Sequence, residues 1–328
     1  MYETPNINTK DEVKKSVVEK RVQRAVAATS ISYQHRDSPL KLNETIDKIV
    51  MEVENYMGGG SDMQHRDALD VVQEFSYELS KMSGKCLDIG SGPGDITKDM
   101  LLPMLGENAE IVGADVSQAM VNYARKNYCD SKRLSYMVLN IETSELPADQ
   151  IGKYDNALSF YCLHWCNDLR RAFENIYKLL RPNGKALTMF IGRHGGFNAY
   201  TELQQVPKYR SYLQDAHLYV PYFQRRLCTD IRGSLREMLA DIGFEILHCS
   251  TREKSYKYSQ QSLKDHILAI NPFLKRIPED MKSDFINHLV YKVINKNALI
   301  PFKKNVNDHV ILRYDLLIAY VQKPLLTV

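Results

Sequence analysis

The sequence predicts an α/β fold in which a mostly parallel sheet of seven strands carries helices on both faces. Three observations support this prediction. Between about residues 67 and 191, short apolar runs alternate with amphipathic segments, as strands and helices do in βαβ units. The first run leads into the glycine-rich turn Gly90-Ser-Gly92-Pro-Gly94, as strands do at the ligand edge of such sheets. Two further strand-like runs follow, near 244–250 and at 310–321, and complete the seven strands.

Each element is predicted from its own local signal, apolar runs for strands and helical spacing of apolar residues for helices. The expected strands are 85–89, 110–114, 134–139, 156–160, 186–191, 244–250 and 310–321. The expected helices are 67–82, one after Gly94, 117–127, 168–180 and one near 231–242. The triplet Pro182-Asn183-Gly184 predicts a turn that introduces the fifth strand.

Charge and cysteine usage exclude several classes of partner. The 328 residues include 43 Lys and Arg and 40 Asp and Glu, a net charge of +3. This charge is too small and too evenly spread to predict a nucleic-acid groove or a polybasic membrane patch. The six cysteines form no CxxC pair, so we expect reduced thiols and no metal site. No secretory signal and no run of about 18 apolar residues is seen, and we expect a cytoplasmic protein without a membrane span.

Residues 1–55 form a separate N-terminal extension before a domain over 56–328. The extension is locally neutral, with nine basic and nine acidic side chains. Thr9 followed by Glu12 is typical of a capping box and predicts a helix near 10–28. A second helix is expected after Asn43, ending at Gly58-Gly59-Gly60. The extension is either an interaction surface or a simple packing addition.

The glycine-rich turn indicates a nucleotide-like cofactor. Gly90, Gly92 and Gly94 would let backbone N–H groups approach a ligand closely. The pyrophosphate fingerprint GxGxxG would need glycine at position 95, where this chain has Asp95, so NAD and FAD are disfavoured. Asp88, before the glycines, suits a cationic ligand group, and S-adenosylmethionine carries both a sulfonium and an ammonium. A turn that is merely tight is the alternative.

The ends of the next strands complete the predicted cofactor site. Asp115 lies 21 positions after Gly94, where a carboxylate can accept hydrogen bonds from both ribose hydroxyls, although a solvated strand-end acid would look the same. Asn140 stands where related folds usually have Asp, and its amide oxygen can still accept from the adenine amino group. Together these features predict a Rossmann-like class I methyltransferase. Neighbouring residues expected at the cofactor are Val116, Ile141 and Phe160.

Several motifs narrow the family. The motifs are residues 159–165 (SFYCLHW), residues 172–180 (AFENIYKLL), Tyr56, Gln64-His-Arg-Asp-Ala68 and Ala269-Ile-Asn-Pro-Phe273. These motifs resemble the insect juvenile hormone acid O-methyltransferase family, and the similarity runs from about Tyr56 to the C-terminus. The resemblance implies that the substrate is a free acid, juvenile hormone acid or farnesoic acid, and that the product is its methyl ester.

The resemblance also implies that Gln64 and Trp165 hold the substrate carboxylate. Chemistry agrees, because the Gln amide and the indole supply N–H donors that a carboxylate needs. Trp165 is the single tryptophan of the chain, and a core aromatic is its alternative role. His164 is expected to orient the acid and not to remove a proton, because a carboxylic acid with a pKa near 4 is already ionised near pH 7.

The methyl transfer predicts a closed, poorly hydrated site, because opposite charges cancel as oxygen attacks the sulfonium methyl. The region 195–258 holds seven of the twenty tyrosines and would suit an apolar isoprenoid tail. We expect 197–228, which follows the fifth strand, to be a helical lid, with plain core packing as the alternative.

Two alternative functions stay open. The first keeps the enzyme class and changes the acid to another terpenoid, a fatty acid or a small aromatic acid. The second is a catalytically silent partner protein that binds S-adenosylmethionine and whose N-terminal helices would be its interaction surface. Methylation of RNA or DNA ranks lower, because the charge lacks a basic footprint and no (D/N)PP(Y/F) tetrapeptide follows the fourth strand. Nothing in the sequence predicts the oligomeric state.

Overall fold

The computed structural model describes residues 53–57, 61–129, 132–297 and 309–325. The helix predicted near 10–28 lies outside these residues, as does most of the helix predicted after Asn43. The last turn of that second helix is described and is helical, as α2 (Val53–Met57). None of the described helices combines the length and the apolar character that crossing a membrane requires.

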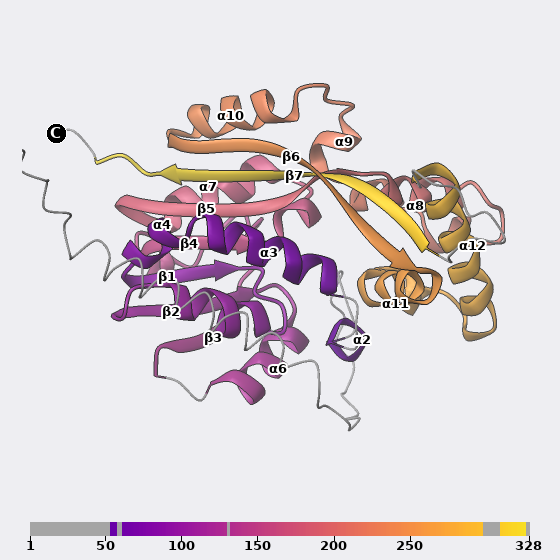
Figure 1. Ribbon diagram of the computed structural model, residues 1–328, viewed down its shortest axis with the longest axis horizontal. Coiled ribbons are helices and arrows are strands. Elements are labelled where there is room, and N and C mark those ends of the chain that lie inside the picture. The colour runs from indigo at the N-terminus through magenta and orange to yellow at the C-terminus, as the bar shows by residue number, and fades with distance from the viewer. Residues whose placement is uncertain (1–52, 58–60, 130–131, 298–308, 326–328) are drawn as a thin grey trace, which may run out of the picture.

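A seven-stranded sheet in the order β3-β2-β1-β4-β5-β7-β6 forms the centre of the molecule (Figure 1). Strands β1 to β5 are parallel to their neighbours, and β7 runs antiparallel to both β5 and β6. The predicted mostly parallel α/β sheet is therefore confirmed. The strands are β1 (Gly84–Ile89), β2 (Ala109–Asp115), β3 (Leu134–Val138), β4 (Tyr154–Phe160), β5 (Leu180–His194), β6 (Glu245–Ser259) and β7 (His309–Gln322).

Two hydrophobic cores cover the two faces of this sheet. Along β5, Met189 and Ile191 belong to one core, whereas Phe190 between them belongs to the other, because successive strand side chains point to opposite faces. The first core receives α3 (Asp62–Glu74), α4 (Ser76–Lys81), α5 (Leu102–Met104), α6 (Gln118–Tyr128), α8 (Asn198–Leu203), α11 (Gln260–Ile270) and α12 (Glu279–Asn297). The second receives α7 (Leu169–Leu179), α9 (Tyr222–Arg225) and α10 (Ile231–Ile242).

The structure corrects two of the predicted boundaries. The helix expected over 67–82 begins five residues earlier, at Asp62, and breaks at Phe75 into α3 and α4. Its earlier start places Gln64 within α3. The turn expected at Pro182-Asn183-Gly184 is an irregularity inside β5, where the register shifts and Asn183 has a φ of 66°.

Strand β6 is much longer than the predicted strand 244–250, whereas β7 matches the predicted strand 310–321 to within one residue at each end. They pair from Glu245 and Gln322 to Ser259 and His309, and so extend beyond the rest of the sheet. Figure 1 shows α8, α11 and α12 gathered around this extension at one end of the molecule. The extension places these helices beside the carboxyl edge of the parallel strands, where the predicted site residues lie.

Candidate active site

Backbone conformation explains the glycines that follow β1. Gly90, Gly92 and Gly94 have φ values of 73°, 55° and 93°, in the left-handed region that other residues rarely adopt. At Gly90 a Cβ atom would also lie 2.2 Å from the Cβ of Cys162 in the turn after β4. At Gly92 a Cβ atom would meet nothing within 4 Å, so backbone conformation alone requires glycine there.

Asp115, at the carboxyl end of β2, joins the glycine turn to the next helix. Its Oδ2 accepts a hydrogen bond from Gly92 N at 3.0 Å, and its Oδ1 accepts one from Ser117 N at 2.8 Å. Ser117 in turn caps α6, accepting from Met120 N. The carboxylate is thus held in one orientation beside the glycines.

Asp88 lies beneath the glycine turn and not on its open side. The side chain is buried, and its Oδ2 accepts a 2.6 Å hydrogen bond from Thr97 Oγ1. Burial raises the pKa of Asp88 to about 7, with a further rise from the carboxylates of Asp115 and Asp95. A carboxyl group with so high a pKa is stabilised in its charged form by any cation that binds nearby.

A cavity of about 850 Å³, including its open mouth, lies at this edge of the sheet. The predicted site residues that line it are Gln64, Gly90, Gly92, Asp115, Val116, His164 and Trp165. The predicted residues that are not among its lining residues are Asp88, Gly94, Asn140, Ile141 and Phe160.

Of this second group, Asn140 is exposed and closes its own turn. Its Oδ1 accepts a hydrogen bond from Glu142 N at 2.9 Å. Ile141 and Phe160 are buried in the two cores and support the loops from beneath. The contact between Asn140 and the adenine amino group stays a prediction.

The predicted carboxylate clamp comes from two elements that both line the cavity. Gln64 lies on α3 and is 6% exposed. His164 and Trp165 lie in a 3-10 turn, Leu163–Trp165, that follows β4. Their rings are 4.9 Å apart between centroids. The fold therefore brings together, at one cavity, residues separated by about a hundred positions in the chain.

His164 is a neutral imidazole. It is 5% exposed, and its Nδ1 has no hydrogen-bond partner in the part of the chain that the structure describes. Burial, and to a smaller extent His194, lowers the pKa of His164 to about 3. A neutral imidazole has one N–H donor and one acceptor nitrogen, so it can orient a ligand oxygen without carrying charge.

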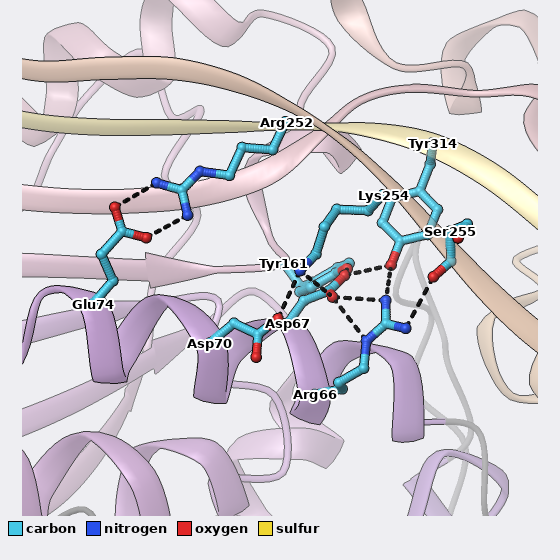
Figure 2. Close-up of polar contacts among 9 residues, drawn as sticks. All are labelled: Arg66, Asp67, Asp70, Glu74, Tyr161, Arg252, Lys254, Ser255 and Tyr314. Atoms are coloured by element: carbon cyan, nitrogen blue, oxygen red, sulfur yellow. Dashed lines mark hydrogen bonds and ion pairs between the residues drawn. The ribbon is translucent and has the colours of Figure 1, made fainter.

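Sequence reasoning missed a buried polar cluster around Asp67 (Figure 2). The Asp67 side chain has no exposed surface, and its Oδ2 accepts hydrogen bonds from the hydroxyls of Tyr161 and Tyr314, each at 2.5 Å. Its Oδ1 accepts from Arg66 Nη2 at 2.9 Å. Tyr161 lines the cavity and has a φ of 57°, so this cluster holds a strained cavity residue in place. The motif around Gln64 contained Asp67, but no local pattern predicted its partners.

Helix α3 also contacts β6 through a series of polar side chains. Arg66, Asp70 and Glu74 are four residues apart and therefore share one face of α3. Figure 2 shows their contacts with three residues of β6: Arg66 donates to Ser255 O at 2.9 Å, Lys254 pairs with Asp70 at 2.6 Å, and Arg252 pairs with Glu74. Helix α3, and Gln64 with it, is thereby positioned relative to the long hairpin.

His65 links α3 to the glycine turn. Its Nδ1 lies 2.8 Å from Ser61 O and its Nε2 lies 2.7 Å from Asp95 Oδ2. Both partners are acceptors, so both ring nitrogens carry a proton and His65 is an imidazolium. Burial alone would lower its pKa, but the contact with Asp95 raises the pKa of His65 above its usual value. Asp95 thus serves this ion pair at the position where a pyrophosphate fingerprint would have glycine.

A second cavity of about 460 Å³, including its open mouth, adjoins the first. The two share walls made by Met63, Ile191, Phe197, His266 and Ile270. Most of the remaining lining of the second cavity is apolar and comes from α11, α12 and β7. The site therefore has a polar end at the glycine turn and an apolar end among the helices.

These residues fit S-adenosylmethionine. The open space over Gly92 admits a ligand close to the backbone, and the fixed Asp115 carboxylate can accept from ribose hydroxyls. The glycine turn lines the same cavity as the Gln64 and Trp165 clamp, so a cofactor and a carboxylate can meet within it.

Comparisons with known proteins point the same way. A family model described as a methyltransferase domain matches residues 87–186. The chain is 32% identical to the juvenile hormone acid O-methyltransferase of Drosophila melanogaster over 268 residues, covering 80% of this chain and 89% of that protein. It is 30% identical to the juvenile hormone acid O-methyltransferase of Bombyx mori over 269 residues, covering 80% and 94%. Among solved structures, the YcgJ protein of Bacillus subtilis shares the fold, with a TM-score of 0.51, 14% identity and coverage of 79% and 99%.

Proposed function

Because this chain belongs to the juvenile hormone acid O-methyltransferase family, we propose that its substrate is a sesquiterpenoid acid, farnesoic acid or juvenile hormone acid. The chain is an S-adenosylmethionine-dependent O-methyltransferase, and the product would be the methyl ester of that acid. The observation that carries the proposal is the pair of adjoining cavities, which connects the glycine turn, the clamp and an apolar pocket.

At the cofactor end, Asp115 would bind the ribose hydroxyls, and the turn at Gly90 and Gly92 would lie against the cofactor. Asp88 would stabilise the positive charge from beneath the turn. When bound, S-adenosylmethionine supplies a methyl group on a sulfonium, which is open to attack by a nucleophile. The remaining steps depend on how the chain holds the acid.

At the clamp, Gln64, Trp165 and His164 would bind the carboxylate. Each offers an N–H donor, and three donors from two elements fix the direction in which the free oxygen lone pair points. No base is required, because the acid is ionised near neutral pH. Walls that exclude water around the bound acid would favour a transition state in which opposite charges cancel.

The second cavity would accept the tail of the acid. Its apolar walls favour a long hydrocarbon chain, and this supports a terpenoid or fatty acid over a small aromatic acid. Residues 197–228 would act as the lid over this tail, since Phe197 and Tyr200 from that segment line the cavity. Helices α11 and α12, outside the predicted lid, supply much of the opposite wall.

The test follows transfer of a labelled methyl group from S-adenosylmethionine to farnesoic, juvenile hormone, lauric and benzoic acids. We expect ester from the sesquiterpenoid acids. Gln64→Glu keeps the shape of the side chain, replaces a donor by a negative charge and should lower kcat/KM at least about 100-fold. Trp165→Phe removes the indole N–H together with one of the two indole rings and should raise KM for the acid.

Gln73→Glu is the matched control, because Gln73 is exposed on the same helix and undergoes the same substitution. It should retain wild-type activity. A wild-type protein that binds S-adenosylmethionine by calorimetry and esterifies none of the four acids would refute the proposal. That outcome would favour the silent, cofactor-binding partner protein.

A further inference from the structure

The apolar cavity contains polar atoms that an all-hydrocarbon tail would leave without partners. Among its lining residues, His194, Tyr200 and His266 carry polar side-chain atoms, and the others are apolar or glycine. Buried donors without a partner are costly, so each one needs water or a ligand atom. The first two of these residues have defined donors.

His194 presents a hydrogen-bond donor from Nε2. Its Nδ1 accepts a hydrogen bond from Gly196 N at 3.0 Å, so Nδ1 carries no proton. Burial, and then the nearby His266, lowers the pKa of His194 to about 4, which leaves the ring neutral near pH 7. The single ring proton therefore sits on Nε2.

Neither donor is used by the protein. Across the described ranges, neither Nε2 of His194 nor the hydroxyl of Tyr200 has a hydrogen-bond partner, and neither is among the fully buried atoms, so both keep some accessible surface. Tyr200 is 4% exposed, and burial alone raises its pKa, so the hydroxyl stays protonated and available to donate. The cavity that both residues line is the place where their partner would bind.

His194 lies apart from the predicted carboxylate clamp. The ring of Phe197 lies 5.5 Å from that of Trp165 and 5.9 Å from that of His194, between centroids. One aromatic ring thus stands between the indole and the imidazole. A group bound at His194 would belong to the tail of an acid whose carboxylate is at Trp165.

We propose that His194 and Tyr200 form a subsite for an uncharged oxygen on the tail of the acid, of the epoxide, ether or carbonyl kind. The two donors are neutral, so they match a neutral acceptor better than a second carboxylate. This inference rests on the proposed function, because it assumes that the tail occupies the second cavity. It makes His194 a specificity-determining residue that favours an oxygenated acid over its hydrocarbon counterpart.

The experiment compares farnesoic acid with its 6,7-epoxide and its 10,11-epoxide. The readouts are kcat/KM for each acid and calorimetric binding of each acid in the presence of S-adenosylhomocysteine. In the wild type, at least one epoxide should exceed farnesoic acid in kcat/KM by about fivefold, as expected for one hydrogen bond.

Two substitutions of His194 separate its two nitrogens. His194→Asn keeps an acceptor near Nδ1 for Gly196 and loses the Nε2 donor, so it should abolish the preference for the epoxide. His194→Gln keeps a donor near Nε2 and loses the contact with Gly196, so it should retain the preference. Tyr200→Phe removes one hydroxyl and should reduce the preference, and it tests the subsite even if the His194 variants fold poorly.

The outcomes distinguish this inference from the proposed function. A wild type that esterifies farnesoic acid but prefers neither epoxide would overturn the subsite and leave the proposed function standing. A preference that survives in His194→Asn and Tyr200→Phe would also overturn it. A wild type that esterifies none of the three acids would remove the proposed function and the subsite together.

Discussion

The hydroxyl of Tyr161 donates a 2.5 Å hydrogen bond to Oδ2 of Asp67, although the two residues are 94 positions apart (Figure 2). Asp67 follows Gln64 by three residues on α3, and Tyr161 precedes His164 by three residues after β4. The bond therefore ties together the two elements that carry the residues of the predicted clamp. Its removal should affect both stability and the binding of the acid.

Asp67→Asn should lower the free energy of unfolding by about 2–4 kcal/mol, because Arg66 and two tyrosine hydroxyls lose a buried anionic acceptor. Urea denaturation measures this loss. The KM for the acid should rise more than kcat falls, because Gln64 is displaced. Asp70→Asn is the control on the same helix, since its pair with Lys254 is exposed and should contribute less than about 1 kcal/mol. Equal losses in the two variants would contradict the role of Asp67.

Stability should depend on pH through His65. The pKa of His65 is raised in the folded state, so the protonated ring contributes stability that is fully present below its unfolded pKa, about 6.5. This contribution is lost as the pH rises through the higher folded-state pKa. The difference in unfolding free energy between wild type and His65→Gln should therefore shrink from pH 6 to pH 9. A difference that stays constant or grows over this range would show that His65 is neutral beside Asp95.

Methyl transfer should show no pH dependence from His164. Its pKa is lowered to about 3 by burial, so the ring stays neutral between pH 6 and pH 8. At saturating S-adenosylmethionine, kcat and kcat/KM for the acid should both be lower in His164→Asn than in wild type. The pH dependence of kcat/KM should be the same in the two proteins. A rise near pH 6.5 that is present in wild type and lost in the variant would identify His164 as a general base.

The two glycines of the turn should respond differently to alanine. Gly92→Ala adds a methyl group into open space and should cost about 1–2 kcal/mol for the left-handed conformation. Gly90→Ala adds a clash with Cys162 to a similar conformational cost, so it should be more destabilising. Thermal unfolding and calorimetric titration with S-adenosylmethionine measure both effects. A Gly92→Ala variant that is less stable than the Gly90→Ala variant would contradict this geometry.

Much of the fold was predictable because its signals are local. The run Lys85–Ile89, the glycines after it and Asp115 at the end of the next run are each recognised within a few residues. The ends of helices and strands were predicted less accurately, because tertiary packing extends or breaks an element. Helix α3 begins at Asp62 because its first turn packs over the cavity, and β6 continues to Ser259 because it pairs with β7 along its whole length.

The residues of the candidate site also divide into those that local patterns predicted and those that only long-range contacts brought in. Local sequence patterns were enough to predict the α/β class, the cofactor turn and the residue types of the clamp, because backbone conformation and hydrogen-bonding chemistry are properties of short segments. Three contacts emerged from the folded chain and from no local pattern: Asp67 anchors Tyr161, His65 pairs with Asp95, and His194 lines an apolar cavity. These contacts join residues far apart in the chain, and burial sets their protonation, so no local pattern contains them.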